Sequence, residues 1–435
     1  MSTTAPDTQR HVPRTVAALV LGAAILFPLV PWLLVGSLDQ RFRGNAVLHS
    51  VANLAAFFAI SAWAANLVLA SRISPIERAF GGLQHLYLVH RRVGVVVVVL
   101  AVVHVVFLTL FKGSDALNLY LPSTGWNTFS GVVALAMLIG FVVASLIGRL
   151  AYPVFVLVQR LLGVAFVLGA FHSYAVRGTG GASPGLTAYL ALLTAAGIAS
   201  LGYRLVGGRL GVGRYRYRVD QVHRIEDDVV EIVLAPAGKR VLGYRPGQFL
   251  YASFRQDGIP GESHPFTIAS VPGGPLAIVV KRLGDYTGLL LQLRAGSDAR
   301  LEGPFGDFHP IADPVHAQTW IAGGIGITPF LSWARALRDS TPADLYYCTP
   351  TAEHAHFLDE LFEIADRHPR LRVIPIRKDS LGRLSVDDIA VVNPRLADDH
   401  VFVCGPQAMI DNIRAGLAAR GIPPERIHSE NFDFR

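Results

Sequence analysis

The chain has 435 residues, of which 51% are hydrophobic and only 16% are charged. Because a soluble globular protein carries about a quarter charged residues, this composition argues against a wholly soluble enzyme and against disorder. The two cysteines, Cys348 and Cys404, exclude a disulfide framework and a cysteine-ligated zinc or iron–sulfur site.

The net charge of +7 is unevenly distributed along the chain. Residues 1–213 carry 14 Lys and Arg against four acidic residues, whereas residues 214–435 carry 25 basic and 28 acidic residues. The basic excess therefore accompanies the apolar segments, which indicates a lipid membrane as partner. The second half has no basic patch interleaved with aromatic residues, so we expect no nucleic-acid partner.

Long uncharged runs recur through the first half of the chain. A membrane-spanning helix needs about 20 apolar residues, and five of the runs are long enough alone. The run at 161–176 reaches this length if its helix starts near Pro153, a residue that a first helical turn tolerates. The six runs, at 15–38, 44–71, 93–111, 116–148, 161–176 and 178–203, predict six spanning helices.

Arginines in the connections predict the orientation of these helices. They gather between the second and third helices (72–92) and after the sixth helix (204–218). Since basic loops stay in the cytoplasm, we expect a multi-pass protein of the cell membrane with both termini cytoplasmic. The first run is longer than a signal peptide and lacks a cleavage site after it, so we expect it to be retained.

The pattern of apolar and polar residues changes near residue 215. Short alternating runs separated by turn signals, such as Pro-Gly at 246–247, predict a small antiparallel barrel. From about residue 316, a strand followed by a helix occurs three times, which is typical of an α/β parallel sheet. We therefore predict three domains: a six-helix transmembrane bundle (1–213), an antiparallel β-barrel (214–313) and an α/β parallel-sheet domain (314–435).

Three histidines lie within the predicted membrane helices. His90 and His104 are 14 residues apart on the third helix, which corresponds to roughly 21 Å along one face, and His172 lies near the outer end of the fifth. Ionisable residues inside a membrane are functional candidates, and neutral imidazole is a common haem ligand. The alternative is a hydrogen bond to a neighbouring helix, and we favour such a structural role for His49 and His85 at helix ends.

Two motifs in the barrel region are typical of a flavin site. The segment 264–270 (HPFTIAS) places an aromatic residue beside a hydroxyl on one strand, where they can cover a flavin ring and hydrogen-bond its N5 edge. The segment 281–287 (KRLGDYT) combines a glycine, a hydroxyl and a helix start, which offer N–H groups to a pyrophosphate. Either segment alone is equally consistent with a plain strand and turn, but their order and spacing favour the flavin interpretation.

Glycine-rich segments follow in the α/β region. Residues 303–306 (GPFG) precede 322–330 (AGGIGITPF), a loop between a strand and a helix, as a dinucleotide site requires. Cys404 ends a late strand in the segment 404–409 (CGPQAM). It is either a small buried filler or a residue that faces a ligand at the carboxyl end of the sheet.

In this order, the motifs resemble those of the ferric reductase / NADPH oxidase family, in which a six-helix haem domain is fused to a ferredoxin-reductase-like module. The resemblance covers roughly residues 14–435 and includes the tail at 430–432. It implies an FAD-binding barrel, an NAD(P)-binding α/β domain, and FAD, NAD(P)H and haem b as cofactors. It also implies a small-molecule or protein electron acceptor on the outer face: dioxygen, a ferric chelate, quinone or a partner.

The resemblance assigns roles to individual residues. Thr267 near flavin N5, Cys404 near the nicotinamide and Phe432 as a tail aromatic that shields the flavin are the expected catalytic residues, and Phe434 could share the last role. The expected cofactor-binding residues are His264, Pro265, Phe266 and Thr267 for the flavin, Lys281, Gly284 and Thr287 for its phosphates, and Gly323, Gly324, Gly326, Thr328, Cys404, Gly405 and Pro406 for the nicotinamide dinucleotide.

The haem ligands expected from the resemblance are incomplete. His104 and His172 match the outer pair, but the inner histidine His90 faces Gln159 where the family has a histidine. An amide oxygen is a poor ligand for haem iron, so we expect one haem b per chain and an inner haem that is absent or weakly held. The alternatives are a membrane-anchored flavin reductase without haem, acting on a cytoplasmic acceptor, and a transport or interaction protein with a vestigial module.

The choice between NADH and NADPH depends on a cation near the 2′-phosphate. No Lys or Arg occurs in 348–351, directly after the second strand of the α/β domain. We therefore expect a preference for NADH, unless Arg377, Lys378 or Arg383 reaches the site from further along the chain.

Overall fold

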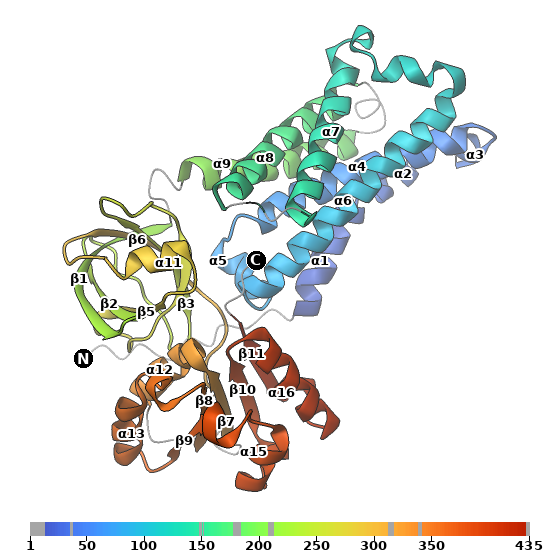
Figure 1. The fold of residues 1–435 in the computed structure, drawn as a ribbon. Helices are drawn as coiled ribbons and strands as arrows, with labels where there is room; N and C mark the ends of the chain where they lie inside the picture. Colours follow the sequence, from blue (N-terminus) through green and yellow to red (C-terminus); the bar gives the residue numbers. More distant parts are fainter. Residues whose placement is uncertain are drawn as a thin grey trace. The chain divides into compact units, whose positions relative to one another are not determined.

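The structure is a computed structural model that describes residues 14–34, 38–147, 150, 152–176, 184–207, 213–311, 317–337 and 342–431. The chain forms two compact units, Met1–Val212 and Gly213–Arg435, and each is described by itself (Figure 1). The domain boundaries given above stay a prediction.

The first unit is a bundle of helices. Six of its spans are long and apolar enough to cross a membrane, which confirms the predicted number within the described residues. The first span consists of two helices, since Pro28 interrupts it. The helices of the bundle are α1 (Arg14–Leu26), α2 (Leu29–Leu34), α4 (Ala46–Leu69), α6 (Leu83–Lys112), α7 (Trp126–Ile147), α8 (Tyr152–Ala175) and α9 (Pro184–Gly202), with short helices α3 (Leu38–Phe42) and α5 (Ser74–Ala79) between them.

Two helices do not begin where their uncharged runs begin. The third spanning helix begins at Leu83 and includes His90, as predicted, because Arg91 and Arg92 interrupt the apolar run but not the helix, for which arginine is a good former. The fourth begins at Trp126, because Gly113 leaves the helical conformation with φ +58° and the chain continues in 3₁₀ turns over Gly113–Tyr120 and Pro122–Thr124. The fifth begins at Tyr152, next to Pro153 as predicted.

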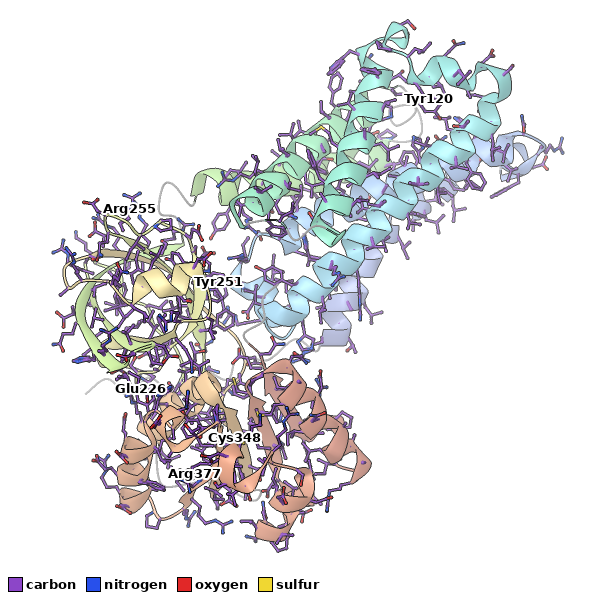
Figure 2. All side chains as sticks on the ribbon, viewed as in Figure 1. Tyr120, Glu226, Tyr251, Arg255, Cys348 and Arg377 are labelled. Carbon is purple, nitrogen blue, oxygen red and sulfur yellow. The ribbon has the colours of Figure 1, made fainter. Side chains whose placement is uncertain are left out.

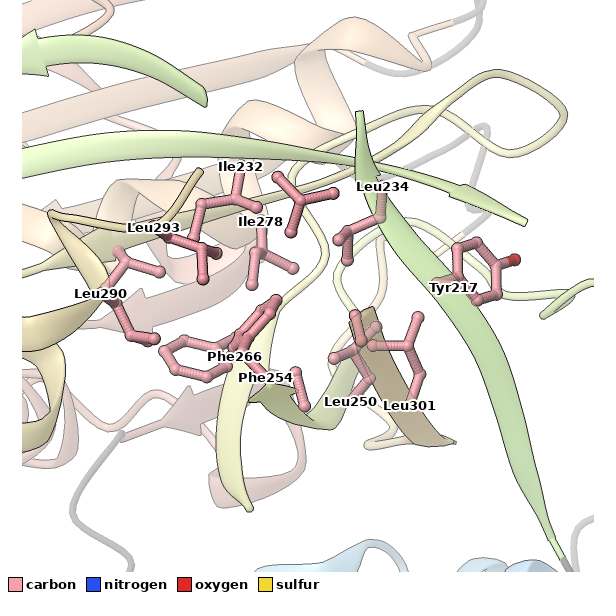
Figure 3. Packing of buried hydrophobic residues seen from close by; sticks show 14 of the residues in the cluster. Tyr217, Ile232, Leu234, Leu250, Phe254, Phe266, Ile278, Leu290, Leu293 and Leu301 are labelled. Carbon is pink, nitrogen blue, oxygen red and sulfur yellow. The ribbon is translucent and has the colours of Figure 1, made fainter. Parts of the chain in front are cut away.

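The second unit begins with a six-stranded antiparallel sheet in the order β4-β3-β6-β1-β2-β5. A bridge between Ile268 and Ile278 links the end of β4 to β5, so that the sheet closes into a barrel. Inward-facing apolar side chains fill it, among them Leu250, Phe254 and Ile278 (Figure 3). The elements are β1 (Arg214–Glu226), β2 (Val229–Pro236), β3 (Phe249–Arg255), β4 (His264–Thr267), β5 (Leu276–Lys281), α11 (Asp285–Leu290) and β6 (Asp298–Phe305).

A five-stranded parallel sheet follows, in the order β11-β10-β7-β8-β9. Its central strands are buried on both faces and therefore consist largely of apolar residues. Its elements are β7 (Gln318–Gly323), α12 (Thr328–Arg335), β8 (Ala343–Thr349), α13 (Leu358–Arg367), β9 (Leu371–Arg377), α14 (Lys378–Leu381), α15 (Val386–Val392), β10 (His400–Cys404), α16 (Gln407–Ala419) and β11 (Ile427–Glu430). The predicted fold class, a helix bundle followed by an antiparallel barrel and a parallel-sheet domain, is confirmed.

One hydrophobic cluster is shared by the barrel and the parallel-sheet domain. Phe308, which follows the last barrel strand, stacks on Trp333 of α12 with ring centroids 5.0 Å apart, and Trp333 meets Phe402 of β10 edge-on at 5.1 Å. Val229 and Ala269 of the barrel region belong to the same cluster. Shared burial of this kind fixes the two domains of the second unit against each other.

Candidate flavin, nucleotide and haem sites

The predicted flavin strand is β4, at one end of the sheet order. In its pairing with β3, Thr267 lies opposite Phe249 and Pro265 opposite Tyr251. Thr267 is only 5% exposed, and its Oγ1 is buried without a hydrogen-bond partner among the described residues. Because leaving a buried hydroxyl unsatisfied costs about 1–3 kcal/mol, this atom fits a site where a bound group supplies the partner. The flavin N5 edge is such a group.

The neighbours of Thr267 have partners that the sequence did not reveal. Phe266 is 8% exposed and belongs to the barrel core (Figure 3), so its role against a flavin ring stays a prediction. His264 stacks on Tyr286 at 4.0 Å between ring centroids, and its Nε2 lies 2.9 Å from a carboxylate oxygen of Glu262. The aromatic–imidazole stack fixes the start of the flavin strand against α11.

The predicted phosphate turn is ordered by its own side chains. The Thr287 hydroxyl accepts hydrogen bonds from the backbone N–H of Leu283 at 2.9 Å and of Gly284 at 3.1 Å. Lys281 forms an ion pair with Asp228 at 3.5 Å. Thr287 therefore shapes the turn, and contact of Lys281, Gly284 and Thr287 with FAD phosphates stays a prediction.

The glycine loop after β7 packs against the turn that follows β10. A Cβ on Gly326 would lie 2.4 Å from the carbonyl oxygen of Cys404, and a Cβ on Gly323 would lie 2.9 Å from Cδ of Pro406. A Cβ on Gly405 would lie 3.0 Å from Cα of Gly323. Larger residues cannot occupy these positions. The glycines are therefore required for the close packing of the two segments, in addition to any contact that they make with a ligand.

Gly324 has a different requirement. Its φ of +54° is in the left-handed region, and no atom lies within 4 Å of a Cβ placed there. The loop is thus open on this side, where a phosphate can approach the backbone. Thr328 begins α12, and its hydroxyl donates to the carbonyl of Ile325 at 3.0 Å, which closes the loop.

Cys404 and Glu430 lie side by side at the carboxyl ends of β10 and β11. Burial, and to a lesser extent the charge of Glu430, raises the pKa of the Cys404 thiol well above its usual value, so the thiol stays protonated. Glu430 is 6% exposed. A Cβ on Gly306 would lie 3.5 Å from Oε1 of Glu430 and 3.1 Å from the ring of Phe249, the strand partner of Thr267.

The structure therefore brings Thr267, Gly306, Cys404 and Glu430 to one region. Sequence reasoning gave Glu430 no role, although an acidic residue in the tail motif, two positions before Phe432, was an available signal. Phe432 and Phe434 lie outside the described residues.

One predicted cation lies at the nucleotide end of the sheet. The parallel pairing of β8 and β9 places Arg377 beside Thr349, the last residue of β8. Lys378 and Arg383 follow Arg377 in the chain. Arg377 is exposed, so its guanidinium is available to an anionic group at this edge.

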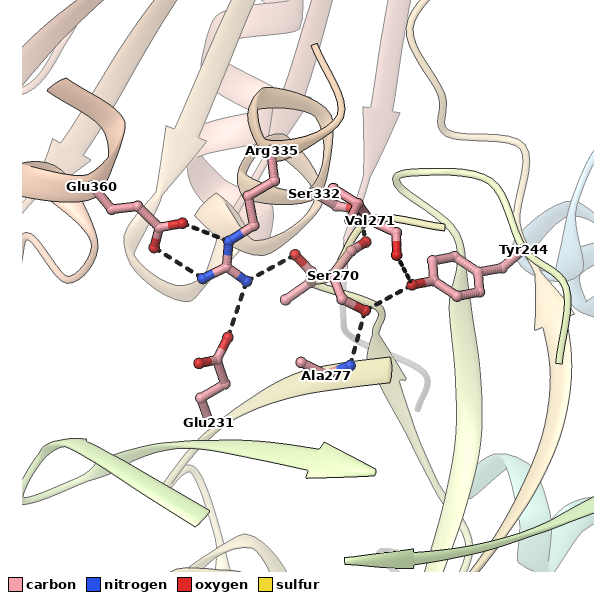
Figure 4. Close-up of polar contacts among 9 residues, drawn as sticks. Glu231, Tyr244, Ser270, Val271, Ala277, Ser332, Arg335 and Glu360 are labelled. Atoms are coloured by element: carbon pink, nitrogen blue, oxygen red, sulfur yellow. Dashed lines mark hydrogen bonds and ion pairs between the residues drawn. The ribbon is translucent and has the colours of Figure 1, made fainter. Parts of the chain in front are cut away.

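A partly buried ion network connects α12 to the end of the flavin strand (Figure 4). Arg335 donates two hydrogen bonds to Glu360, at 2.6 and 2.9 Å, and one to Glu231 of the barrel at 3.0 Å. It also donates to the carbonyl of Ala269 at 3.0 Å, and Ser332 donates to the carbonyl of Ser270 at 3.0 Å. The helix that opens at the glycine loop is therefore bonded to the residues directly after Thr267.

The three membrane histidines share one hydrogen-bonding pattern. Nδ1 lies 3.2 Å from the carbonyl of Asn66 in His90, 2.9 Å from that of Ala52 in His104 and 2.9 Å from that of Asn127 in His172. A carbonyl only accepts, so each Nδ1 carries the proton, and the Nε2 of each neutral ring keeps its lone pair. Metal-binding histidines typically have this arrangement.

The packing of the His172 ring depends on a glycine of the neighbouring helix. A Cβ on Gly131 of α7 would lie 2.7 Å from Nδ1 of His172, so only glycine allows the ring to lie against that helix. His104 and His172 are close enough to interact electrostatically. The expected role of these two residues as haem ligands stays a prediction.

The inner position is different. Gln159 donates from Nε2 to Ser145 Oγ at 3.3 Å, and no described contact joins it to His90. His85 receives a hydrogen bond from Arg14 at 3.3 Å at the end of α6. His49 stacks on Phe111 at 4.8 Å, which agrees with the structural role expected for it.

Comparison with known proteins adds three family matches. Residues 55–170 match "Ferric reductase like transmembrane component", residues 214–306 match "FAD-binding domain", and residues 320–415 match "Oxidoreductase NAD-binding domain". This is the organisation of the ferric reductase / NADPH oxidase family. The predicted resemblance is thereby confirmed: this ferric-reductase-like chain is a multi-pass membrane protein with an FAD-binding domain and an oxidoreductase NAD-binding domain.

Curated relatives match only part of the ferric-reductase-like chain. The reductase component of propane 2-monooxygenase from Rhodococcus jostii (strain RHA1) is 26% identical over 249 residues, which are 52% of this chain and 66% of the relative. The glycine betaine monooxygenase reductase subunit of Chromohalobacter salexigens is 28% identical over 238 residues, which are 51% of this chain and 64% of the relative. The chain spans just under two thirds of these relatives' lengths.

Solved structures show a limited similarity. Flavohemoglobin from Malassezia yamatoensis, with bound FAD and heme, has a TM-score of 0.47 at 20% identity and covers 89% of this chain and 97% of its own. The FAD/NAD binding domain of nitric oxide dioxygenase from Vibrio cholerae O1 biovar El Tor has a TM-score of 0.45 at 21% identity and covers 50% of this chain and 98% of its own.

Proposed function

We propose that the protein passes electrons from cytoplasmic NAD(P)H across the membrane, through FAD and one haem b, to an acceptor on the outer face. Flavin takes up a hydride and releases electrons singly, which is what a nicotinamide donor and a haem acceptor together require. The observation that carries the proposal is the paired arrangement of His104 and His172 on α6 and α8, each with Nδ1–H donated to a carbonyl and Nε2 available.

The chain's own residues have defined tasks in this proposal. The hydroxyl of Thr267 would hydrogen-bond the N5 edge of the flavin, and the protonated thiol of Cys404 would present a neutral surface to the nicotinamide. Gly324 would let the dinucleotide phosphates approach the backbone. The carboxylate of Glu430, beside Cys404, would orient the nicotinamide or hold a proton near it.

The orientation follows from loop charge. Arginines gather in the second-to-third connection and after the sixth helix, and the positive-inside rule places both in the cytoplasm. We therefore propose that the flavin module and both termini are cytoplasmic. Dioxygen, a ferric chelate, quinone or a protein partner would be reduced on the opposite side.

A visible absorption spectrum of the purified protein tests the proposal. We expect flavin and haem bands in the protein as isolated, and reduction of both when NAD(P)H is added without oxygen. His104→Ala and His172→Ala should each remove the haem band and keep FAD, whereas the control His49→Ala should keep both. A flavin band without any haem band in the wild-type protein would instead support a haem-free flavin reductase.

A further inference from the structure

The outer face of the barrel carries a grid of arginines. In the register of β3, β6 and β1, three rows of side chains lie on the face away from the barrel core: Tyr251–Glu302–Arg214, Ser253–Arg300–Arg216 and Arg255–Asp298–Arg218. The opposite face of the same strands holds the buried residues Leu250, Ala252 and Phe254 of the barrel core. Five of these nine positions are therefore arginines on one face, and of the nine only Tyr251 is buried.

Two of these arginines form ion pairs with carboxylates on the same face. Arg214 pairs with Glu302 at 3.7 Å and Arg218 with Asp298 at 3.9 Å. For Arg216, Arg255 and Arg300, no ion pair occurs among the residues that the structure describes. The two ion pairs thus include both acidic residues of the grid. The positive charges of Arg216, Arg255 and Arg300 lie outside these two pairs.

The central pair of arginines in the grid lowers the stability of the folded barrel. Arg216 lies directly opposite Arg300, and like charges at such positions destabilise a sheet. The pKa of Arg300 is lowered, first by burial and then by the charges of Arg255, Arg214 and Arg216. An external anion that neutralises the cluster would remove this repulsion.

The connection between the sixth span and β1 is short. The sixth span ends in the turn Tyr203–Gly207, and β1 begins at Arg214. The seven Cα–Cα steps from Gly207 to Arg214 reach at most roughly 25 Å, which limits the distance between the end of the span and the start of β1. Arg216 follows two positions later on the same strand.

We propose that this face, the arginine grid of β1, β3 and β6, docks on anionic lipid headgroups through Arg216, Arg255 and Arg300. Arg255 is labelled on the barrel in Figure 2. The predicted flavin strand β4 pairs with β3, where Pro265 lies opposite Tyr251. Arg216, Arg255 and Arg300 lie in the two rows of the grid beyond Tyr251. Docking would hold the barrel to the membrane surface by contacts additional to the covalent connection.

The test uses the full-length protein in lipid nanodiscs. A Ser253→Cys variant carries a bimane fluorophore in the central row of the grid. The native thiols react poorly under native conditions, because burial raises the pKa of Cys348 to about 12 and Cys404 is fully buried. Phosphatidylcholine with a nitroxide on its headgroup quenches the fluorophore when the grid approaches the membrane surface.

We expect stronger quenching when the nanodiscs contain phosphatidylglycerol than when they contain phosphatidylcholine alone. Each basic residue at an anionic surface favours the docked state by roughly fivefold, so the three arginines together contribute about a hundredfold. Raising the ionic strength from about 0.1 M to about 1 M, which shortens the Debye length from about 10 Å to about 3 Å, should remove the difference.

Charge reversal provides the matched comparison. Arg216→Glu, Arg255→Glu and Arg300→Glu together should abolish the effect of phosphatidylglycerol at unchanged FAD content. The control triple, Arg367→Glu, Arg395→Glu and Arg414→Glu, makes the same change in net charge at exposed positions of the parallel-sheet domain and should quench like the parent.

Several results would overturn the proposal. Quenching that is equal with and without phosphatidylglycerol, or insensitive to salt, excludes an anionic lipid partner. The lipid comparison and the salt comparison need only the labelled parent protein. Equal loss in both triple variants would reveal a general charge effect. Loss of FAD from the grid variant in an otherwise folded protein would assign the arginines to the flavin site.

Discussion

Replacing Arg335 by methionine tests whether the ion network of α12 positions the glycine loop relative to the flavin strand. The side chain of Arg335 is 19% exposed, and those of its partners Glu231 and Glu360 are 16% and 35% exposed. Methionine has a similar length but none of the four hydrogen bonds that Arg335 donates to Glu360, Glu231 and the Ala269 carbonyl.

The expected loss of stability follows from leaving two carboxylates without their cation. Removing one partner of a fully buried ion pair costs about 3–5 kcal/mol. Because Glu360 is partly exposed, we take the lower limit of about 3 kcal/mol. A domain of 150–250 residues loses about 2–4 °C of melting temperature per kcal/mol, so the second unit should melt about 6–12 °C lower.

The catalytic effect should exceed what reduced stability explains. Misplacing reacting groups by about 1 Å can slow a reaction about a hundredfold, and Arg335 bonds the residue two positions after Thr267. We expect Arg335→Met to slow flavin reduction by NAD(P)H at temperatures where the protein is folded and FAD is bound. Stopped-flow absorbance gives this rate, and flavin release on heating gives the melting temperature.

Two comparisons make the result specific. Arg372→Met removes an ion pair with Asp344 in which the arginine is 56% exposed, and it should cost at most about 1 kcal/mol. Arg335→Met combined with Glu360→Met should destabilise less than the sum of the two single changes, because the second removes a charge that the first left unpaired. An Arg335→Met protein that melts and reduces flavin like the wild type would refute the reasoning.

Four further expectations concern single residues. Thr267→Ala should slow flavin reduction and leave FAD largely bound; a wild-type rate would show that the hydroxyl is not at N5. Because Arg377 lies beside the last residue of β8, Arg377→Ala should lower kcat/KM for NADPH more than for NADH, and equal losses in steady-state kinetics would exclude a 2′-phosphate contact. A pyridine haemochrome assay should give about one haem per FAD, and Gln159→His should raise that ratio; two tightly held haems in the wild type would contradict the incomplete inner site. The carboxylate of Asp307 accepts a hydrogen bond from the His309 imidazole and raises its pKa. The stabilisation from this pair is therefore complete below the unfolded pKa of about 6.5 and is lost as pH rises through the raised pKa; the melting temperature should fall over that window, and His309→Gln should flatten the profile.

Local sequence determined the elements and their class. Hydropathy alone predicted six spanning helices, because lipid requires long apolar stretches whose backbone groups are bonded within each helix. The alternation of apolar and polar residues predicted the barrel, and the repeated order of strand and helix predicted the parallel sheet. The uncharged runs do not give the first residues of the third and fourth helices, since Arg91 and Arg92 do not end a helix whereas Gly113 does.

The motif residues were found from sequence, but what surrounds them was not. The glycines of the loop after β7 were predicted as ligand-binding residues, and the structure adds that Gly323 and Gly326 pack against the turn at 404–406. Thr287 and Lys281 have local partners that no motif indicates. A motif records residue types along the chain and holds no information about which other segment lies against it.

Only the tertiary structure decided which distant residues meet. Strand pairing places Glu430 beside Cys404 and Arg377 beside Thr349, and helix packing gives the Nδ1 of His104 and His172 their carbonyl partners. Local patterns follow from backbone hydrogen bonding and from the solvent on each face of an element, both of which act within a few residues. The partners across strands and helices follow from the packing of the whole chain, which depends on every segment at once.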